Sequence, residues 1–217
     1  GLLSHSGSRG LGANIANYYT QIAMQKTVLP KEAKHLAWLG LDTEAGQEYW
    51  TAMNLAGDYA SACHHQIHHR MAKSLGEKAL AIVENHHNFA WKETLSDLQE
   101  VIIHRKGATP AHANELGIIP GSMTTAAYLV SGKGVENALY SASHGAGRAM
   151  SRQRAKENTT ASALKKMLGN AGVTLIGGSV EENPLAYKDI EKVIAAQREL
   201  VEIQGKFLPK IVRMNKD

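Results

Sequence analysis

The stretch Ser141-Ala142-Ser143-His144-Gly145-Ala146-Gly147-Arg148 places one histidine among small residues and leads on to a second arginine, Arg152. It predicts a strand followed by a glycine-rich turn, because glycine allows close approach of the backbone and unusual dihedral angles. A helix starting near Gly145 would present free N–H groups beside His144, which is an arrangement that binds phosphate. Arg148 and Arg152 would then share one face of that helix. The alternative is a strand-to-helix turn around a buried, hydrogen-bonded histidine.

Strand and helix signals mix along the rest of the chain without a regular repeat, which favours an α+β fold with mixed sheets and peripheral helices. Apolar spacing predicts a helix over 13–25 and a long helical segment over about residues 43–75, capped by Asp42 or Thr43 and ended by Gly76. Shorter helices are expected up to about residue 156, over about 160–168 and over about 185–200. Strands are expected at the following stretches: 1–4, 79–83, 101–104, 117–119, 124–130, 173–176 and part of 201–214. No linker is evident, so we expect one undivided region over residues 1–217.

Composition is that of an ordinary soluble globular chain, with 217 residues, 43% hydrophobic and 20% charged. No apolar run is long enough for a membrane span, so no membrane partner is expected. The single cysteine, Cys63, excludes an internal disulfide and fits a reducing, cytoplasmic compartment. The chain begins with Gly1 and reaches a motif almost at once, which we interpret as an internal start.

Basic residues are clustered, although the net charge is only +4. Residues 148–166 contain six lysines and arginines against one acid, and residues 206–216 contain four and no acid. Such clusters favour phosphate-rich partners. A solvated basic face is the alternative.

Histidine is abundant, with eleven residues, and histidine is the commonest metal ligand. His5, His87, His104 and His144 are expected in loops that follow strands, where sites are usually built. His5 and one member of the His86–His87 pair would supply two nitrogens to a divalent transition metal. In an extended segment the two neighbours point to opposite faces, so only one would meet a given ligand. Polar surface is the alternative interpretation.

Three further stretches have two interpretations each. His64 and His68, like His65 and His69, have zinc-like spacing on the long helix, but no acid lies between them, which favours a solvated or RNA-facing surface. The segment Pro120-Gly121-Ser122-Met123, which continues into Thr124 and Thr125, has the features of a backbone clamp for a ligand, or of an ordinary turn between strands. The segment 105–109 places two cations beside a flexible turn, which suits phosphate or is simply a solvated loop.

Taken together and in this order, these stretches resemble the RtcB family of GTP-dependent RNA 3′-phosphate ligases. Six segments that cover nearly the whole chain carry the resemblance: His-Ser-Gly-Ser-Arg-Gly-Leu-Gly (5–12), His-His-Asn-Phe (86–89), His-Arg-Lys-Gly-Ala-Thr (104–109), Ile-Pro-Gly-Ser-Met (119–123), Ser-His-Gly-Ala-Gly-Arg-Ala-Met-Ser-Arg (143–152) and Ala-Tyr-Lys-Asp-Ile (186–190). Each segment alone is a weak signal, but the ordered set is specific. It implies an RtcB-like fold.

The resemblance implies a ligase that joins RNA 3′-phosphate or 2′,3′-cyclic phosphate ends to 5′-hydroxyl ends, in tRNA splicing or RNA repair. Its cofactors would be GTP and Mn²⁺, and it would act through a GMP–histidine intermediate. An archease-like activator is implied as a candidate partner.

By motif position, the resemblance makes His144 the guanylylated nucleophile and makes His5 and His87 ligands of manganese. The other implied contacts are to the nucleotide or its phosphates: Asn88, Pro120, Gly121, Ser122, Met123, Gly145, Ala146, Gly147, Arg148 and Tyr187.

The chain departs from the family pattern in three places. Ala127 stands where the family has a serine, and no carboxy-terminal lysine aligns cleanly, so Lys210 and Lys216 are both candidates for the family's nucleotide contact. The amino-terminal aspartate, cysteine and Asn-His pair of the family are absent, and Cys63 has a different context. We therefore expect these 217 residues alone not to complete guanylylation. Two alternatives stay open, a non-catalytic RNA-binding protein derived from the ligase fold and a histidine-rich metal protein unrelated to RNA.

Overall fold

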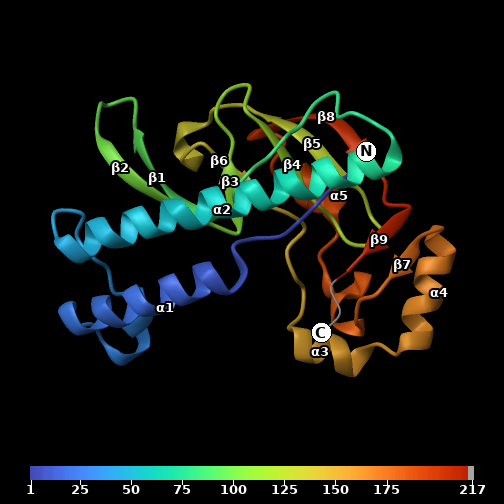
Figure 1. Ribbon diagram of the computed structural model, residues 1–217, viewed down its shortest axis with the longest axis horizontal. Coiled ribbons are helices and arrows are strands. Elements are labelled where there is room, and N and C mark those ends of the chain that lie inside the picture. The colour runs from blue at the N-terminus through green and yellow to red at the C-terminus, as the bar shows by residue number, and fades with distance from the viewer. Residues whose placement is uncertain (215–217) are drawn as a thin grey trace. The chain divides into compact units, whose positions relative to one another are not determined.

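The computed structural model describes residues 1–214, apart from the side chain of Arg9, as two compact units, Gly1–Ile82 and Val83 onward. The first unit is helical. It contains α1 (Arg9–Lys26), the 3₁₀ helix η1 (Lys31–Leu36) and α2 (Glu44–Leu75), and α1 and α2 lie side by side (Figure 1). The ring centroids of Tyr19 on α1 and Tyr49 on α2 are 5.3 Å apart. Among the described residues, no helix is both long and apolar enough to cross a lipid bilayer.

The long helix predicted over about 43–75 is confirmed as α2. The residues at its two ends explain why the sequence predicts it well. The Thr43 side chain accepts a hydrogen bond from the Gly46 N–H at 3.1 Å, which satisfies one of the free donors at the helix start. Gly76 ends the helix with φ of 71°, a left-handed conformation that glycine adopts without strain. The strand predicted over 1–4 is wrong, since the segment before α1 forms no regular structure.

In the described part of the second unit, residues 83–214, the strands form four small sheets. Strands β1 (Asn88–Thr94) and β2 (Glu100–Lys106) form an antiparallel hairpin, and β3 (Ala108–Pro110) pairs with β6 (Ser141–Ser143). The central sheet has the order β4-β5-β8, from β4 (Leu116–Ile119), β5 (Ala127–Gly132) and β8 (Val201–Phe207). Strands β7 (Thr174–Ile176) and β9 (Ile211–Arg213) pair in parallel.

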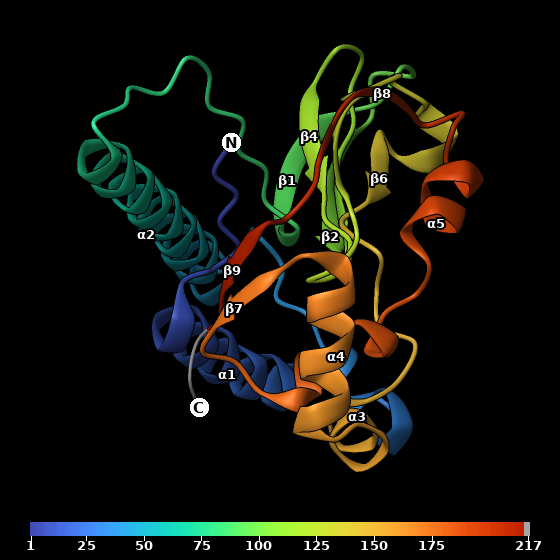
Figure 2. The same cartoon turned by 90° about the vertical axis from the view of Figure 1, so that its right-hand side faces the viewer.

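Short helices lie between these strands in the sequence. They are α3 (Arg152–Asn158), α4 (Ala161–Ala171) and α5 (Ile190–Ala196), with the 3₁₀ turns η2 (Glu136–Ala138), η3 (Val180–Glu182) and η4 (Pro184–Ala186). Ile190 and Ile194 of α5 pack with Ile119, Tyr128 and Val130 of the central sheet in one buried cluster, and Figure 2 shows α5 beside this sheet. Met123, Leu164, Leu168 and Val173 form a second cluster beneath α4. This mixture confirms the predicted α+β class.

Two further predictions of secondary structure are wrong. Residues 79–83 form no strand, and residues 79–82 are exposed, because an apolar run becomes a strand only where a partner strand completes its hydrogen bonds. The helix predicted over about 185–200 is reduced to α5, because Pro184–Ala186 forms a 3₁₀ turn and Tyr187, which follows it, is extended and bridged to Arg148.

Candidate functional site

His144 and His87 lie against each other in the second unit. His144 follows the end of β6 and His87 immediately precedes β1. Their rings are stacked, with centroids 4.8 Å apart and planes within 12° of parallel. The backbone of Gly107 connects them, since its N–H donates to the His87 carbonyl at 3.2 Å and its carbonyl accepts from the His144 N–H at 3.4 Å. Three segments that the sequence presents separately therefore meet at this pair.

Gly107 also sets the space beside the His144 ring. Its φ is 76°, and a Cβ at this position would lie 3.8 Å from Nε2 of His144. A side chain here would be strained by the backbone conformation and would contact the imidazole. A glycine therefore keeps the main chain close to His144 without a side chain that would occupy the adjoining space.

Asn85 holds the loop that carries His87. Its Nδ2 donates to Oγ1 of Thr109 at 2.7 Å, and its Oδ1 accepts from the Ile118 N–H at 3.3 Å. The Thr109 hydroxyl donates in turn to the carbonyl of His86 at 3.2 Å. The loop is therefore tied to β3 and β4. Asn85 thus braces this loop through its side-chain amide.

His86 and His87 have different neighbours, as the alternation of an extended segment predicts. The ring centroids of His86 and Phe89 are 5.6 Å apart, while the His87 ring stacks on the ring of His144. Asn88, the next residue, is exposed at the start of β1, and its Oδ1 lies 3.4 Å from Nζ of Lys106.

The predicted clamp Pro120–Met123 packs directly against the glycine-rich segment after His144. The Ala146 N–H donates to the Pro120 carbonyl at 2.9 Å, and a Cβ at Gly145 would lie 3.1 Å from the same oxygen. Small residues are therefore needed at this contact. Inside the clamp, Ser122 donates its N–H to Oγ1 of Thr125 at 2.7 Å. Thr125, the last residue of the stretch that the sequence singled out, thus fixes the conformation of the turn.

Met123 contributes its backbone to the clamp but not its side chain. That side chain is 7% exposed and packs with Leu164, Leu168 and Val173 in the second apolar cluster. It therefore anchors the turn to the protein interior.

No helix starts at Gly145, so the predicted helix N-terminus beside His144 is wrong. Gly147 has φ of 71°, which glycine adopts readily, and the segment continues in extended form to Arg148. Helix α3 begins only at Arg152, where the Ser151 side chain caps it by accepting from the Arg154 N–H. Arg148 and Arg152 consequently do not share one face of a helix.

Arg148 and Tyr187 face each other across a short antiparallel bridge. The Ala149 N–H donates to the Ala186 carbonyl at 2.8 Å, and the Lys188 N–H donates to the Gly147 carbonyl at 3.0 Å. The Arg148 guanidinium lies over the Tyr187 ring, 5.3 Å from its centroid. The motif around His144 and the Ala-Tyr-Lys segment are therefore one structural element, although they are far apart in the sequence.

Tyr187 is held as a neutral phenol. Burial is the main cause that raises its pKa to about 12; the hydrogen bond and negative charge of Glu182 also raise the pKa, and the Arg148 guanidinium lowers it. Because the pKa is raised, the hydroxyl keeps its proton at neutral and moderately alkaline pH. It remains a hydrogen-bond donor, and its acceptor is Glu182.

His5 belongs to the first unit, on the segment that precedes α1, and His87 belongs to the second. In the first unit, Oγ of Ser4 and Nε2 of His68 are 2.8 Å apart, so one helix histidine holds the segment next to His5. Within the part of the chain that the structure describes, no three His, Cys, Asp or Glu side chains are grouped as a metal site.

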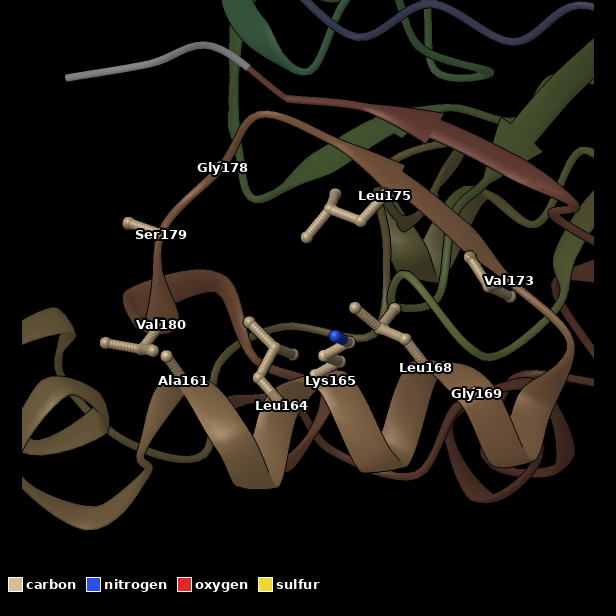
Figure 3. Close-up of a pocket in the computed structure, with 10 residues that line it drawn as sticks. All are labelled: Ala161, Leu164, Lys165, Leu168, Gly169, Val173, Leu175, Gly178, Ser179 and Val180. Atoms are coloured by element: carbon tan, nitrogen blue, oxygen red, sulfur yellow. The ribbon is translucent and has the colours of Figure 1, made fainter.

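An apolar cavity of about 620 Å³ lies between α4 and β7. Leu164, Leu168 and Leu175 project into it, with Lys165 and Ser179 among the few polar residues of the lining (Figure 3). None of the predicted site residues lines this cavity. It is therefore separate from the histidine pair.

The family model described as tRNA-splicing ligase RtcB matches residues 1–215. The chain belongs to the RtcB family. The RNA-splicing ligase RtcB of Escherichia coli K12 is 34% identical over 216 residues, which cover 93% of this chain and 53% of that protein. The tRNA-splicing ligase RtcB of Methanococcus maripaludis is 37% identical over 226 residues, covering 88% of this chain and 47% of that protein. The chain spans about half the length of these curated relatives.

Membership of the RtcB family was predicted from six ordered segments. The structure shows where two of the departures from the family pattern lie. Ala127 is buried in β5, with 4% of its surface exposed. Lys210, one candidate for the carboxy-terminal lysine, accepts a hydrogen bond from the Thr174 N–H through its carbonyl and so anchors β9 to β7. Lys216, the other candidate, lies outside the described residues.

Proposed function

We propose that this RtcB-family chain carries the nucleotide-transferring part of an RNA ligase, with His144 as the residue that accepts GMP from GTP. The observation that carries the proposal is the stacking of His144 on His87 at 4.8 Å, bridged by the Gly107 backbone. The relatives named as RNA-splicing and tRNA-splicing ligases support RNA as the substrate. The basic residues of segment 148–166 fit such a polyanion.

The site's main chain fits a bound nucleotide. Among the described residues, no atom lies within 4 Å of a Cβ placed at Gly147, whereas a Cβ at Gly107 would be in van der Waals contact with the His144 ring, 3.8 Å from Nε2. We assign the base and ribose to the Pro120–Met123 clamp and Tyr187, with Asn88 holding GMP. The phosphates would then meet the backbone of Gly145–Gly147 and the guanidinium of Arg148.

His144 would attack through Nε2, because its Nδ1 is buried. A bond from this nitrogen to the α-phosphorus of GTP would form while the bond from that phosphorus to the bridging oxygen breaks, which releases pyrophosphate. The GMP group would next pass to an RNA 3′-phosphate, after opening of a 2′,3′-cyclic phosphate where one is present. Attack by the RNA 5′-hydroxyl would join the two ends and release GMP.

Manganese would supply charge stabilisation at the phosphates. We assign His5 and His87 as the ligands that this chain contributes. The described residues do not by themselves gather a set of three donors.

The test is a labelling experiment on the full protein that contains this chain, with GTP labelled at the α-phosphorus and with manganese. We expect wild type and His104→Ala to form an acid-labile protein–GMP adduct and His144→Ala to form none. His104 is a suitable control because it is an exposed histidine on β2. An adduct that persists in His144→Ala, in protein shown by circular dichroism to be folded, would refute the assignment.

A further inference from the structure

One carboxylate, that of Glu182, contacts both residues of the Arg148–Tyr187 bridge. Its Oε2 lies 3.3 Å from Nη1 of Arg148 and also accepts the hydrogen bond of the Tyr187 hydroxyl. Its other oxygen lies 3.5 Å from Nε of Arg152. Glu182 lies at the end of η3, and its side chain is only 17% exposed. Partial burial strengthens these interactions relative to a surface ion pair.

The Arg148 guanidinium is held from three directions. Glu182 engages Nη1, the Glu181 carbonyl accepts from Nη2 at 2.7 Å, and the Met150 carbonyl accepts from Nε at 3.1 Å. Two of these three partners come from η3. The orientation of Arg148 thus depends on a turn that lies more than thirty residues further along the chain.

The neighbouring carboxylate, Glu181, has a different partner. Its Oε2 lies 2.7 Å from Nζ of Lys156, which belongs to α3, and this contact holds the pKa of Glu181 below its usual value. The two adjacent carboxylates therefore differ in their main partner, although the charge of Glu181 also acts on Arg148 and Arg152. Glu181 pairs with Lys156 of α3, whereas Glu182 contacts Arg148 and Tyr187, the two residues of the bridge.

We propose that Glu182 is a positioning residue that sets Arg148 and Tyr187 for the transfer of GMP to and from His144. This inference rests on the function proposed above. A carboxylate with two guanidinium partners leaves one positive charge uncompensated, so Arg148 can be oriented by Glu182 and still attract phosphate. Arg152, whose side chain is 70% exposed, supplies the second charge at the protein surface.

The proposal predicts different effects for two nearly isosteric substitutions in the full protein. Glu182→Gln keeps an acceptor for the Tyr187 hydroxyl but loses the charge that orients Arg148. We expect it to slow single-turnover adduct formation at saturating GTP by about tenfold or more, which corresponds to about 1.4 kcal/mol of lost transition-state stabilisation. Glu181→Gln, the matched control, should stay within about twofold of wild type. Glu182→Asp, which retains the charge, should recover much of the lost rate.

The readouts separate positioning from a structural contribution. Thermal unfolding of each variant shows whether Glu182→Gln is folded at the assay temperature, and the rate is compared with the apparent KM for GTP. A positioning function lowers the rate and is rescued by Glu182→Asp, whereas equal rates for Glu182→Gln and Glu181→Gln overturn it. If the two variants react at equal rates and wild type forms the adduct, the function proposed for His144 stands. If wild type forms no adduct, both proposals fall.

Discussion

Replacing Gly121 by alanine tests whether the clamp Pro120–Met123 is as tightly packed as the structure describes. A Cβ on Gly121 would lie 2.5 Å from the carbonyl oxygen of Ala126 and 2.4 Å from Oγ1 of Thr125. The carbonyl belongs to the backbone, so the turn itself must move. Oγ1 of Thr125 also accepts the Ser122 N–H, so the displacement would break that hydrogen bond as well.

The expected magnitude follows from overpacking and the lost hydrogen bond. Overpacking in a tight site costs about 1–3 kcal/mol. In a protein of this size each kcal/mol lowers the melting temperature by about 2–4 °C, so the expected decrease is about 2–12 °C. Since the clamp is proposed to hold the nucleotide, the apparent KM for GTP should rise as well.

The matched control is Gly169→Ala, in the same unit. Gly169 lies in α4, it is exposed, and among the described residues no atom comes within 4 Å of its Cβ position. Alanine is favoured over glycine in a helix by up to about 1 kcal/mol, so this change should raise the melting temperature by a few degrees. Differential scanning calorimetry of the full protein measures both. A melting temperature for Gly121→Ala equal to or above that of wild type would refute the packing described for the clamp.

Two further substitutions test the supports of the site, each by urea denaturation of the full protein. Asn85→Ala removes partners of the Thr109 hydroxyl and the Ile118 N–H, so it should lower the free energy of unfolding by about 1–3 kcal/mol, whereas exposed Asn88→Ala should change it by less than about 0.5 kcal/mol. Equal effects would contradict the bracing by Asn85. The buried guanidinium of Arg105 pairs with the carboxylate of Glu93. Arg105→Met removes this partner and should lower the free energy of unfolding by about 3–5 kcal/mol, whereas Lys106→Met, at the exposed neighbouring position, should lower it little. A small effect of Arg105→Met would mean that Glu93 finds another partner.

The parts of the fold that the sequence predicted well are those with local determinants. Helix α2 has its cap at Thr43 and its end at Gly76 written into the chain. The failures occur where a partner distant in sequence decides. Residues 79–83 are apolar enough for a strand but have no strand partner, and Tyr187 leaves a helical pattern because it pairs with Arg148.

The same distinction applies to the candidate site. Glycines and histidines with uncommon spacing are visible in a sequence, so His87, His144 and the clamp were singled out before their contacts were known. Glu182 was not, because a glutamate in an ordinary acidic stretch has no distinctive pattern. Its importance depends on the Arg148–Tyr187 bridge, which only the fold reveals.

The structure also changes how the segment after His144 is proposed to bind phosphate. A helix N-terminus would have offered several N–H groups and a dipole as a preformed anion site. The extended segment offers fewer donors, and the left-handed Gly147 leads instead to Arg148, whose charge is oriented by η3. The proposed anion site therefore depends on a side chain and its supports more than on the backbone alone. For that reason the comparison of Glu182→Gln with Glu181→Gln tests the site more directly than a substitution of the glycines would.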